Sequence, residues 1–372
     1  MLNVIDLFAG CGGLSTGFEQ ADFNIALAVE KDLSAAETYK YNHPQTKVLI
    51  KDITELTSVK SYINIEIDGV IGGPPCQSFS LSGNRDPKDP RSSLFMDFMR
   101  IVRDVNAKFF VMENVPGMLS MKTLTNEKVL DIILKEMENS GYNVAYFVLN
   151  AAEFGVPQNR KRLIFIGIKN DIPFDIKKIE PKGFLFGKDQ ITIEQAIMDL
   201  PQIQACEGED VQEYTTPPQN EYQKYCRQNS FSVFNHIAMR HTKRLIDRFA
   251  QIKFGQSVAD VPKEYGQRKR GEATKLSGKK YSQNNFRPFP DKPSPTIPAS
   301  FQSNFVHPYL NRNYTAREGA RLQSFPDTYI FKGNRTNMSW QKDLSQYQHI
   351  GNAVPPLLAK HIALTIKNYF NI

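Results

Sequence analysis

The stretch Asp6-Leu7-Phe8-Ala9-Gly10-Cys11-Gly12-Gly13-Leu14 decides the fold of this 372-residue chain. It continues a short apolar run that begins at Val4 and is typical of a buried strand. Glycines just after a strand let the backbone approach a ligand, and the N-terminus of a following helix favours the same contact. Ser15 occupies the third glycine position of the dinucleotide fingerprint, so that fingerprint is not met. A nucleoside ligand without a required diphosphate is therefore expected.

Strand and helix signals alternate over the first 170 residues. A helix is expected over 126–140, where apolar residues recur on one face and Gly141 follows. The β-α-β alternation predicts a mostly parallel, doubly wound sheet with helices on both faces. Further strands are expected at 25–30, 48–52, 69–71, 109–112, 142–149 and 163–168.

The pattern changes after about residue 170. Helical periodicity becomes rarer there, and Pro, Gly and polar residues interrupt the chain more often. A second, smaller domain built around loops is expected. From about residue 353 the chain is again apolar and helical, and we expect this last piece to return to the first domain.

Composition excludes several classes of protein. Hydrophobic residues make up 41% of the chain and charged residues 23%, which is ordinary for a globular protein and argues against disorder. No apolar run reaches the roughly 18 residues that a membrane span needs. The four cysteines form no C-x-x-C pair and the six histidines show no metal spacing, so no metal is expected. The N-terminus does not look like a signal peptide, and a reducing cytoplasm is the expected location.

The positive charge is concentrated in one region. Residues 227–290 contain 14 Lys and Arg against 4 Asp and Glu, a balance of +10, while the rest of the chain has a balance of −3. Such a regional excess favours a polyanionic partner, above all nucleic acid. On charge alone, a solvated basic surface remains an equally good interpretation.

Two acidic residues follow the next strands. Glu30 ends the second strand about 20 residues after the Gly-rich turn, where an acid suits ribose hydroxyls, and Asp52 closes the third, where it could face an adenine amino group. The alternative is a tight turn with two exposed acids.

A rigid turn carries one thiol after the fourth strand. Residues 72–80 read Gly-Gly-Pro-Pro-Cys-Gln-Ser-Phe-Ser, and the two prolines fix the backbone just before Cys76. A cysteine at a strand end can be a nucleophile, although most free cysteines are buried hydrophobes. Glu113 is expected at the same edge of the sheet, and strand alternation would put Arg160 and Arg162 on one face. A thiol, an acid and two guanidiniums would then converge near the nucleoside site.

These residues resemble the DNA (cytosine-5) methyltransferases, particularly the bacterial modification enzymes. The resemblance covers nearly the whole chain, follows the family's motif order and shows no departure at a catalytic position. It implies a Rossmann-like, S-adenosyl-L-methionine (AdoMet)-dependent methyltransferase fold with a smaller DNA-recognition domain. The matching segments are 6–18, 73–77, 113–115, 158–162, 287–297, 317–326 and 351–356.

The resemblance assigns roles to individual residues. Cys76, Glu113, Arg160 and Arg162 would be catalytic. The cofactor-binding residues would be Asp6, Phe8, Ala9, Gly10, Cys11, Gly12, Gly13, Leu14, Glu30, Asp52, Ile53, Pro75, Asn352 and Ala353. The DNA-binding residues would be Gln77, Ser80, Ser82, Arg91, Arg268, Lys269 and Arg270.

The resemblance also implies a reaction. Cys76 would add to C6 of a cytosine flipped out of double-stranded DNA, C5 would take the methyl group of AdoMet, and S-adenosyl-L-homocysteine would be the product. The catalytic AdoMet-binding domain would comprise residues 1–185 and 344–372, and the target-recognition domain and hinge 186–343. A bacterial, cytoplasmic monomer paired with a cognate restriction endonuclease, and without a membrane partner, is expected.

Three other functions compete with this one. The same reaction on tRNA is the nearest, but the large basic region between the arginine motif and the late motifs favours DNA. A DNA-binding protein without activity would have lost Cys76, Glu113 or Arg160, and all three are present. A nicotinamide-dependent oxidoreductase would need the missing glycine and would leave Cys76 unexplained.

Overall fold

The structure is a computed structural model that describes residues 1–75, 93–123, 126–269, 272–278, 281–337 and 341–371. The chain divides into two compact units. Unit 1 consists of Met1–Phe154, Lys161–Phe184 and Ala353–Ile372, and unit 2 of Gly155–Arg160 and Leu185–Asn352. No helix in the described ranges is long and apolar enough to cross a membrane.

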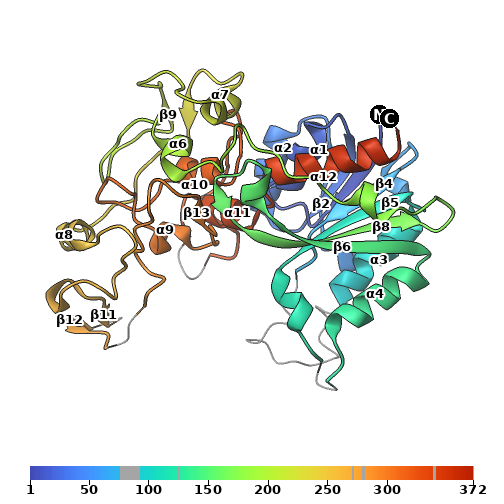
Figure 1. Cartoon of the computed structure of the whole chain (residues 1–372), viewed down its shortest axis with the longest axis horizontal. Coiled ribbons are helices and arrows are strands. Elements are labelled where there is room, and N and C mark those ends of the chain that lie inside the picture. The colour runs from blue at the N-terminus through green and yellow to red at the C-terminus, as the bar shows by residue number, and fades with distance from the viewer. Residues whose placement is uncertain (76–92, 124–125, 270–271, 279–280, 338–340, 372) are drawn as a thin grey trace. The chain divides into compact units, whose positions relative to one another are not determined.

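Unit 1 is built on a seven-stranded sheet with the order β3-β2-β1-β4-β5-β8-β6. Figure 1 labels β2, β4, β5, β8 and β6 of this sheet. Only β8 runs antiparallel to its neighbours, β5 and β6. The predicted mostly parallel α/β fold is therefore confirmed. The strands are β1 (Asn3–Leu7), β2 (Asn24–Glu30), β3 (Lys47–Ile50), β4 (Gly69–Gly72), β5 (Phe109–Asn114), β6 (Tyr142–Asn150) and β8 (Lys161–Lys169).

Helices cover both faces of this sheet, and adjacent residues of β5 show how. Phe110 packs against Phe98 and Tyr142 on one face, while Phe109 packs against Phe23 and Phe370 on the other. Successive side chains of a strand point to opposite faces, so β5 is buried on both. The helices of unit 1 are α1 (Gly13–Glu19), α2 (Leu33–Asn42), α3 (Ser93–Asp104), α4 (Val129–Asn139), α5 (Ile176–Ile179) and α12 (Pro356–Tyr369).

Two predicted boundaries are wrong by a few residues. Helix α4 begins at Val129 rather than at 126, because Asn126 adopts a left-handed backbone (φ 66°) inside a turn. Strand β3 ends at Ile50 rather than at 52, because the side chain of Asp52 accepts a hydrogen bond from the Thr54 N–H and caps a short 3-10 helix. In both cases a local turn ends the regular pattern.

The chain order creates a switch point beside β1. Strand β1 pairs with β2 on one side and with β4 on the other, so the connections from β1 and β4 leave in opposite directions. In open parallel sheets this arrangement leaves a crevice at the carboxyl ends of the two strands, where ligands bind. The Gly-rich turn follows β1 and the Pro74–Pro75 turn follows β4.

The last helix of the chain packs directly on the first. A Cβ atom added to Gly17 would lie 2.4 Å from Ala359 Cβ and 2.4 Å from the Pro356 carbonyl oxygen, and one added to Gly13 would lie 2.3 Å from the Val354 carbonyl oxygen. Both glycines therefore permit a backbone contact that no other residue would allow. This contact places the C-terminal segment beside the Gly-rich turn.

Unit 2 contains little regular structure. Its two-residue strands pair as β9 with β10 and as β7 with β13, and β11 and β12 form a separate antiparallel ribbon. The strands are β7 (Gln158–Asn159), β9 (Val211–Gln212), β10 (Val233–Phe234), β11 (Arg268–Lys269), β12 (Glu272–Leu276) and β13 (Ser294–Pro295). The helices are α6 (Ile193–Ile197), α7 (Glu221–Arg227), α8 (Lys243–Gln251), α9 (Phe301–Asn304), α10 (Ala316–Leu322) and α11 (Gln346–Asn352).

Paired charges stabilise the interior of unit 2. Arg312 donates to Glu318 at 2.6 and 2.8 Å, and Arg321 donates to Asp327 and Asp199. Burial raises the pKa of Glu318, but the Arg312 charge lowers it by more. The net pKa lies below the ordinary value, so the carboxyl stays ionised. Removing one member would leave a buried, unpaired charge, which is strongly destabilising.

We expect Gly17→Ala to destabilise the protein, although alanine is the better helix former. Helix propensity alone would stabilise the variant by about 1 kcal/mol. The new methyl group would instead overlap the backbone of α12 and force the two helices apart. Differential scanning calorimetry should show a clearly lower Tm. Gly117→Ala is the control, because its Cβ would meet nothing within 4 Å. An equal or higher Tm for Gly17→Ala would contradict the close approach of α1 and α12.

Candidate active site

The Gly-rich turn has an unusual backbone. Phe8, Gly10 and Gly12 all have positive φ, at 57°, 54° and 92°. This conformation costs little at the two glycines but roughly 1–2 kcal/mol at a residue with a side chain, such as Phe8. The turn is held by hydrogen bonds from the Ala9 N–H to the Val29 carbonyl (3.1 Å) and from the Gly12 N–H to the Ala9 carbonyl (2.9 Å). Strain of this kind is retained where the surrounding structure enforces it, and it concentrates at functional sites.

Glu30 fastens this turn to the end of β2. One carboxylate oxygen accepts the Gly10 N–H at 2.8 Å and the other accepts the Asp32 N–H at 2.7 Å. Burial raises the pKa of Glu30, and these backbone donors partly offset the effect. Each oxygen still has a lone pair with which to accept from a ligand hydroxyl. The residue predicted to face ribose thus also shapes the turn.

Asp6 lies at the end of β1 and is completely buried. Its Oδ2 accepts the Ser15 hydroxyl at 2.6 Å, and that hydroxyl is also 2.6 Å from the hydroxyl of Tyr39. Burial raises the pKa of Asp6 to about 7, an effect that the hydrogen bond from Ser15 opposes. The sequence does not point to Tyr39, because a tyrosine in a helix carries no motif.

The other predicted cofactor residues occupy several parts of unit 1. Leu14 is buried in α1, and Cys11 is buried in the Gly-rich turn. Ile53 is buried in the 3-10 helix capped by Asp52, which forms an ion pair with Lys31 at 3.4 Å. Pro75 is exposed after β4, and Ala353 begins the C-terminal segment of unit 1, whereas Asn352 belongs to unit 2.

The donor and acceptor groups around the turn fit a nucleoside with a cationic side arm. A Cβ on Gly10 would meet nothing within 4 Å, so the turn is open at that point. Glu30 supplies acceptors for hydroxyls, and one carboxylate oxygen of Asp6 has no hydrogen-bond partner among the described residues. In the described part of the chain, no group of three or more His, Cys, Asp or Glu side chains could hold a metal ion.

An acidic side chain of β5 and a basic side chain of β8 meet at the carboxyl end of β5. Glu113 forms an ion pair with Arg162 at 2.7 Å, and both side chains are largely buried. A Cβ on Gly73 would lie 3.0 Å from Glu113 Oε2, and the Asn114 amide donates to the Pro74 carbonyl at 3.1 Å. The Pro74 turn and Glu113 are therefore neighbours, while the predicted proximity of Glu113 to Cys76 stays a prediction. Cys76 itself lies outside the described residues.

Arg160 does not share a continuous strand with Arg162. Strand β7 ends at Asn159 and β8 begins at Lys161, and the Arg160 N–H closes a turn onto the Gln158 carbonyl at 3.0 Å. The expected strand alternation across 160–162 is therefore wrong. The Arg160 guanidinium is buried in unit 2, where it donates to the carbonyls of Ile297 (2.9 Å) and Gly351 (3.0 Å).

The predicted DNA contacts are only partly described. Arg268 and Lys269 form β11, with Arg268 partly exposed and Lys269 exposed. Gln77, Ser80, Ser82, Arg91 and Arg270 lie outside the described residues. Two arginines of the basic region are instead structural. Arg248 donates to the Tyr265 and Gly266 carbonyls, and Arg287 to carbonyls that include Ile252 and Phe249.

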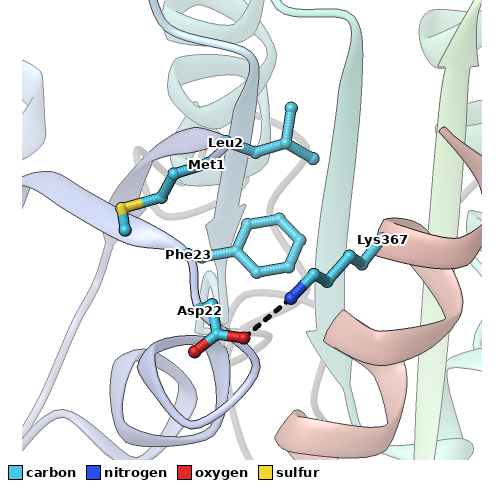
Figure 2. Close-up of a pocket in the computed structure, with 5 residues that line it drawn as sticks. All are labelled: Met1, Leu2, Asp22, Phe23 and Lys367. Carbon is cyan, nitrogen blue, oxygen red and sulfur yellow. Dashed lines mark hydrogen bonds and ion pairs between the residues drawn. The ribbon is translucent and has the colours of Figure 1, made fainter. Parts of the chain in front are cut away.

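Two pockets of the described chain lie at the opposite end of the sheet. Figure 2 shows the first, of about 210 Å³, where Met1, Leu2 and Phe23 lie beside an ion pair between Asp22 and Lys367. The second is lined by Asn24 and Lys47, at the starts of β2 and β3, among others. Ligands bind at the carboxyl ends of parallel strands, so neither pocket is the candidate site.

We expect Phe8→Gly to be more stable than Phe8→Ala. Both changes remove the same ring, but only glycine adopts a positive φ without strain. The difference in the free energy of unfolding, measured with urea, should be about 1 kcal/mol in favour of glycine. Phe98 in α3 is the control, since helical backbone reverses the order and alanine should be the more stable there. The same order at both positions would contradict strain at Phe8.

Comparison with known proteins identifies the family. The model of the C-5 cytosine-specific DNA methylase family matches residues 2–368. Type II methyltransferase M.DdeI from Desulfomicrobium norvegicum is 58% identical over 370 residues, covering 99% of this chain and 89% of the relative. Type II methyltransferase M1.HphI from Haemophilus parahaemolyticus is 37% identical, covering 97% of this chain and 86% of the relative.

Solved structures agree with the fold. A putative DNA modification methyltransferase encoded within a prophage of E. coli matches with a TM-score of 0.78 at 26% identity, covering all of both chains. The S. pombe Dnmt2 methyltransferase matches with a TM-score of 0.62 at 19% identity, again over all of both chains, which is evidence for the fold alone. The chain therefore belongs to the C-5 cytosine-specific DNA methylase family, as the order of its sequence motifs predicts.

Proposed function

We propose that this AdoMet-dependent DNA methyltransferase flips a cytosine out of a specific short duplex sequence and methylates its C5 through a covalent Cys76–C6 adduct. The modification would protect DNA from a cognate restriction endonuclease in a bacterial cytoplasm. Relatives named as type II methyltransferases support this setting. The enzyme would act as a monomer, since one flipped base needs one active site.

Cys76 would be the nucleophile, because C5 of cytosine is too poor a nucleophile to take a methyl group unaided. Its thiolate adds to C6, which forms a C–S bond and moves electron density to C5. After C5 is methylated, a base such as water or hydroxide removes the C5 proton. The C–S bond then breaks, the 5,6 double bond re-forms and the thiolate is regenerated.

Glu113 and Arg162 would stabilise the charge that develops on the ring during addition. Glu113 would hydrogen-bond or protonate N3 of the cytosine, and Arg162 lies 2.7 Å from its carboxylate. Because Glu113 lies beside Gly73 and its neighbour Asn114 binds Pro74, three and two residues before Cys76, we infer that the acid and the thiol act on the same base. This proximity is the observation that carries the proposal. Arg160 would act indirectly, by holding the segment that leads into β8.

The Gly-rich turn and the acids around it would hold the cofactor. When bound, AdoMet supplies an electrophilic methyl group on its sulfonium. Glu30 would accept from the ribose hydroxyls and Asp52 with Ile53 would face the adenine. The remaining cofactor residues would be Asp6, Phe8, Ala9, Gly10, Cys11, Gly12, Gly13, Leu14, Pro75, Asn352 and Ala353.

Unit 2 would bind the DNA. Flipping the base costs a few kcal/mol of stacking and pairing, which phosphate and groove contacts must offset. The β11–β12 ribbon carries Arg268 and Lys269, and a two-stranded ribbon can enter the major groove. Arg270, which lies outside the described residues, would also contact the DNA. Gln77, Ser80, Ser82 and Arg91 would contact the DNA around the flipped base.

Glu113→Gln should lower kcat about 10²- to 10⁴-fold while leaving the Kd for AdoMet unchanged. The amide keeps the shape of the side chain but cannot donate a carboxyl proton to N3. Methyl transfer to DNA from radiolabelled AdoMet measures the rate, and calorimetry measures the affinity. Glu127→Gln, at an exposed position, is the control. A kcat within a factor of three of wild type would remove Glu113 from the mechanism.

Bisulfite sequencing tests the proposal as a whole. DNA from a methylation-free host that expresses the chain should contain protected cytosines in one short repeated context. Cys76→Ser should abolish this protection, because a hydroxyl is a far weaker nucleophile than a thiolate at neutral pH. Soluble protein that binds AdoMet but protects no cytosine would refute the DNA activity, and RNA would then be tested as the substrate.

A further inference from the structure

Asp6 is a buried carboxyl without a positively charged partner among the described residues. The side chain is fully buried, and its Oδ1 has no hydrogen-bond partner among the described residues. The other charges that act on it, on Glu30 of β2 and Glu19 of α1, are also negative. A buried carboxylate is costly unless it is paired with a positive group. The protein alone therefore leaves this carboxyl short of one cationic partner.

Ser15 and Tyr39 determine how the carboxyl is held. An ionised carboxylate only accepts hydrogen bonds, so the Ser15 hydroxyl must donate to Asp6 Oδ2. The Ser15 oxygen is then free to accept, and the Tyr39 hydroxyl, 2.6 Å away, must be its donor. Thr46 acts in turn as a side-chain hydrogen-bond partner of Tyr39. This directed chain stabilises the ionised form of Asp6 and fixes its orientation.

The groups around Asp6 oppose the ionisation of its carboxyl. Burial raises the pKa of Asp6 to about 7, and Glu30 and Glu19 act in the same direction. The nearby Cys11 thiol and the Tyr39 hydroxyl remain neutral, since burial raises the pKa of both. His43 lies on Tyr39, with a ring distance of 4.4 Å, and pairs with Glu19. Near neutral pH, Asp6 of the free protein is therefore less completely ionised than an exposed aspartate would be.

We propose that Tyr39 and Ser15 are positioning residues that hold Asp6 for a cationic group of the bound nucleoside, and that binding this group ionises Asp6 and releases its proton. The proposal rests on AdoMet binding at the Gly-rich turn. The cation supplies the missing charge, and the proton leaves Asp6 for the solvent, so charge and atoms balance. AdoMet carries two candidate cations, the ammonium and the sulfonium.

Calorimetry of the full-length protein at pH 7, in two buffers with different ionisation enthalpies, counts the protons released on binding. Three ligands separate the cations. AdoMet has both, S-adenosyl-L-homocysteine has only the ammonium, and 5′-methylthioadenosine has neither. We expect AdoMet binding to release a proton from Asp6 and 5′-methylthioadenosine binding to release none. Because Asp6 would also raise the pKa of a bound ammonium, the titrations are repeated at pH 6. An α-amino group (pKa about 7.7–8.0) is protonated there both free and bound, so a difference between wild type and Asp6→Asn then reports on Asp6 itself.

The variants give the second measurement. Tyr39→Phe removes the donor to Ser15, so more of the free protein is protonated at Asp6 and the affinity for AdoMet at pH 7 should fall about three- to tenfold. At pH 9 Asp6 is ionised in both proteins, and the affinity should return toward wild type. A merely structural defect would not recover with pH. Ser15→Ala should behave in the same way.

Tyr142→Phe is the matched control. Tyr142 is also a buried tyrosine of unit 1, its hydroxyl donates to the Ala107 carbonyl at 2.6 Å, and it packs on the other face of the sheet. Tyr142→Phe should keep the wild-type affinity for AdoMet and the wild-type pH dependence of that affinity. Equal proton release by wild type and Asp6→Asn, or a pH-independent loss in Tyr39→Phe, would overturn the inference. Failure of wild type to bind any of the three ligands would instead refute the proposed function.

Discussion

The placement of β1 between β2 and β4 is the constraint on which the site depends. Because the connections from β1 and β4 leave in opposite directions, the Gly-rich turn and the Pro74 turn end at the same edge of the sheet. Strand β5 then places Glu113 beside Gly73. The Gly-rich turn and the Pro74 turn come from segments about 60 residues apart, and only the strand order brings them to one edge.

The Gly-rich turn shows how stability and function compete at this edge. Phe8 is held in a strained left-handed conformation, and Glu30 and Asp6 are carboxyls in a buried environment. Glu30 is compensated by two backbone donors, while Asp6 has only the Ser15 side of its carboxylate satisfied. A turn prepared in this way has unmet polar groups for which a ligand can compensate. The close packing of Val354 on Gly13 and of α12 on Gly17 keeps the turn in place without the ligand.

The basic region illustrates a limit of charge counting. Its net charge of +10 suggested a surface for a polyanion. Arg248 and Arg287, however, are buried and bind backbone carbonyls, so they hold loops together and are not part of any surface. The described part of unit 2 has few hydrogen-bonded strands. Its buried guanidiniums instead bind the backbone carbonyls of loops, as neighbouring strands do in the sheet of unit 1. Lys269 on β11, by contrast, is exposed, so its charge is available to a polyanion.

The sequence by itself determined the α/β class, the family and the identity of the proposed catalytic and cofactor residues, because those residues lie in contiguous motifs at strand ends. It could not determine the break at Arg160, since a turn between two strands leaves no signal in an alternating pattern. Nor could it find Tyr39, whose role depends on the packing of α2 against α1. Only the tertiary structure decided which oxygen of the Asp6 carboxylate is hydrogen-bonded and which has no partner among the described residues. Burial and hydrogen bonding depend on neighbours that are distant in the chain.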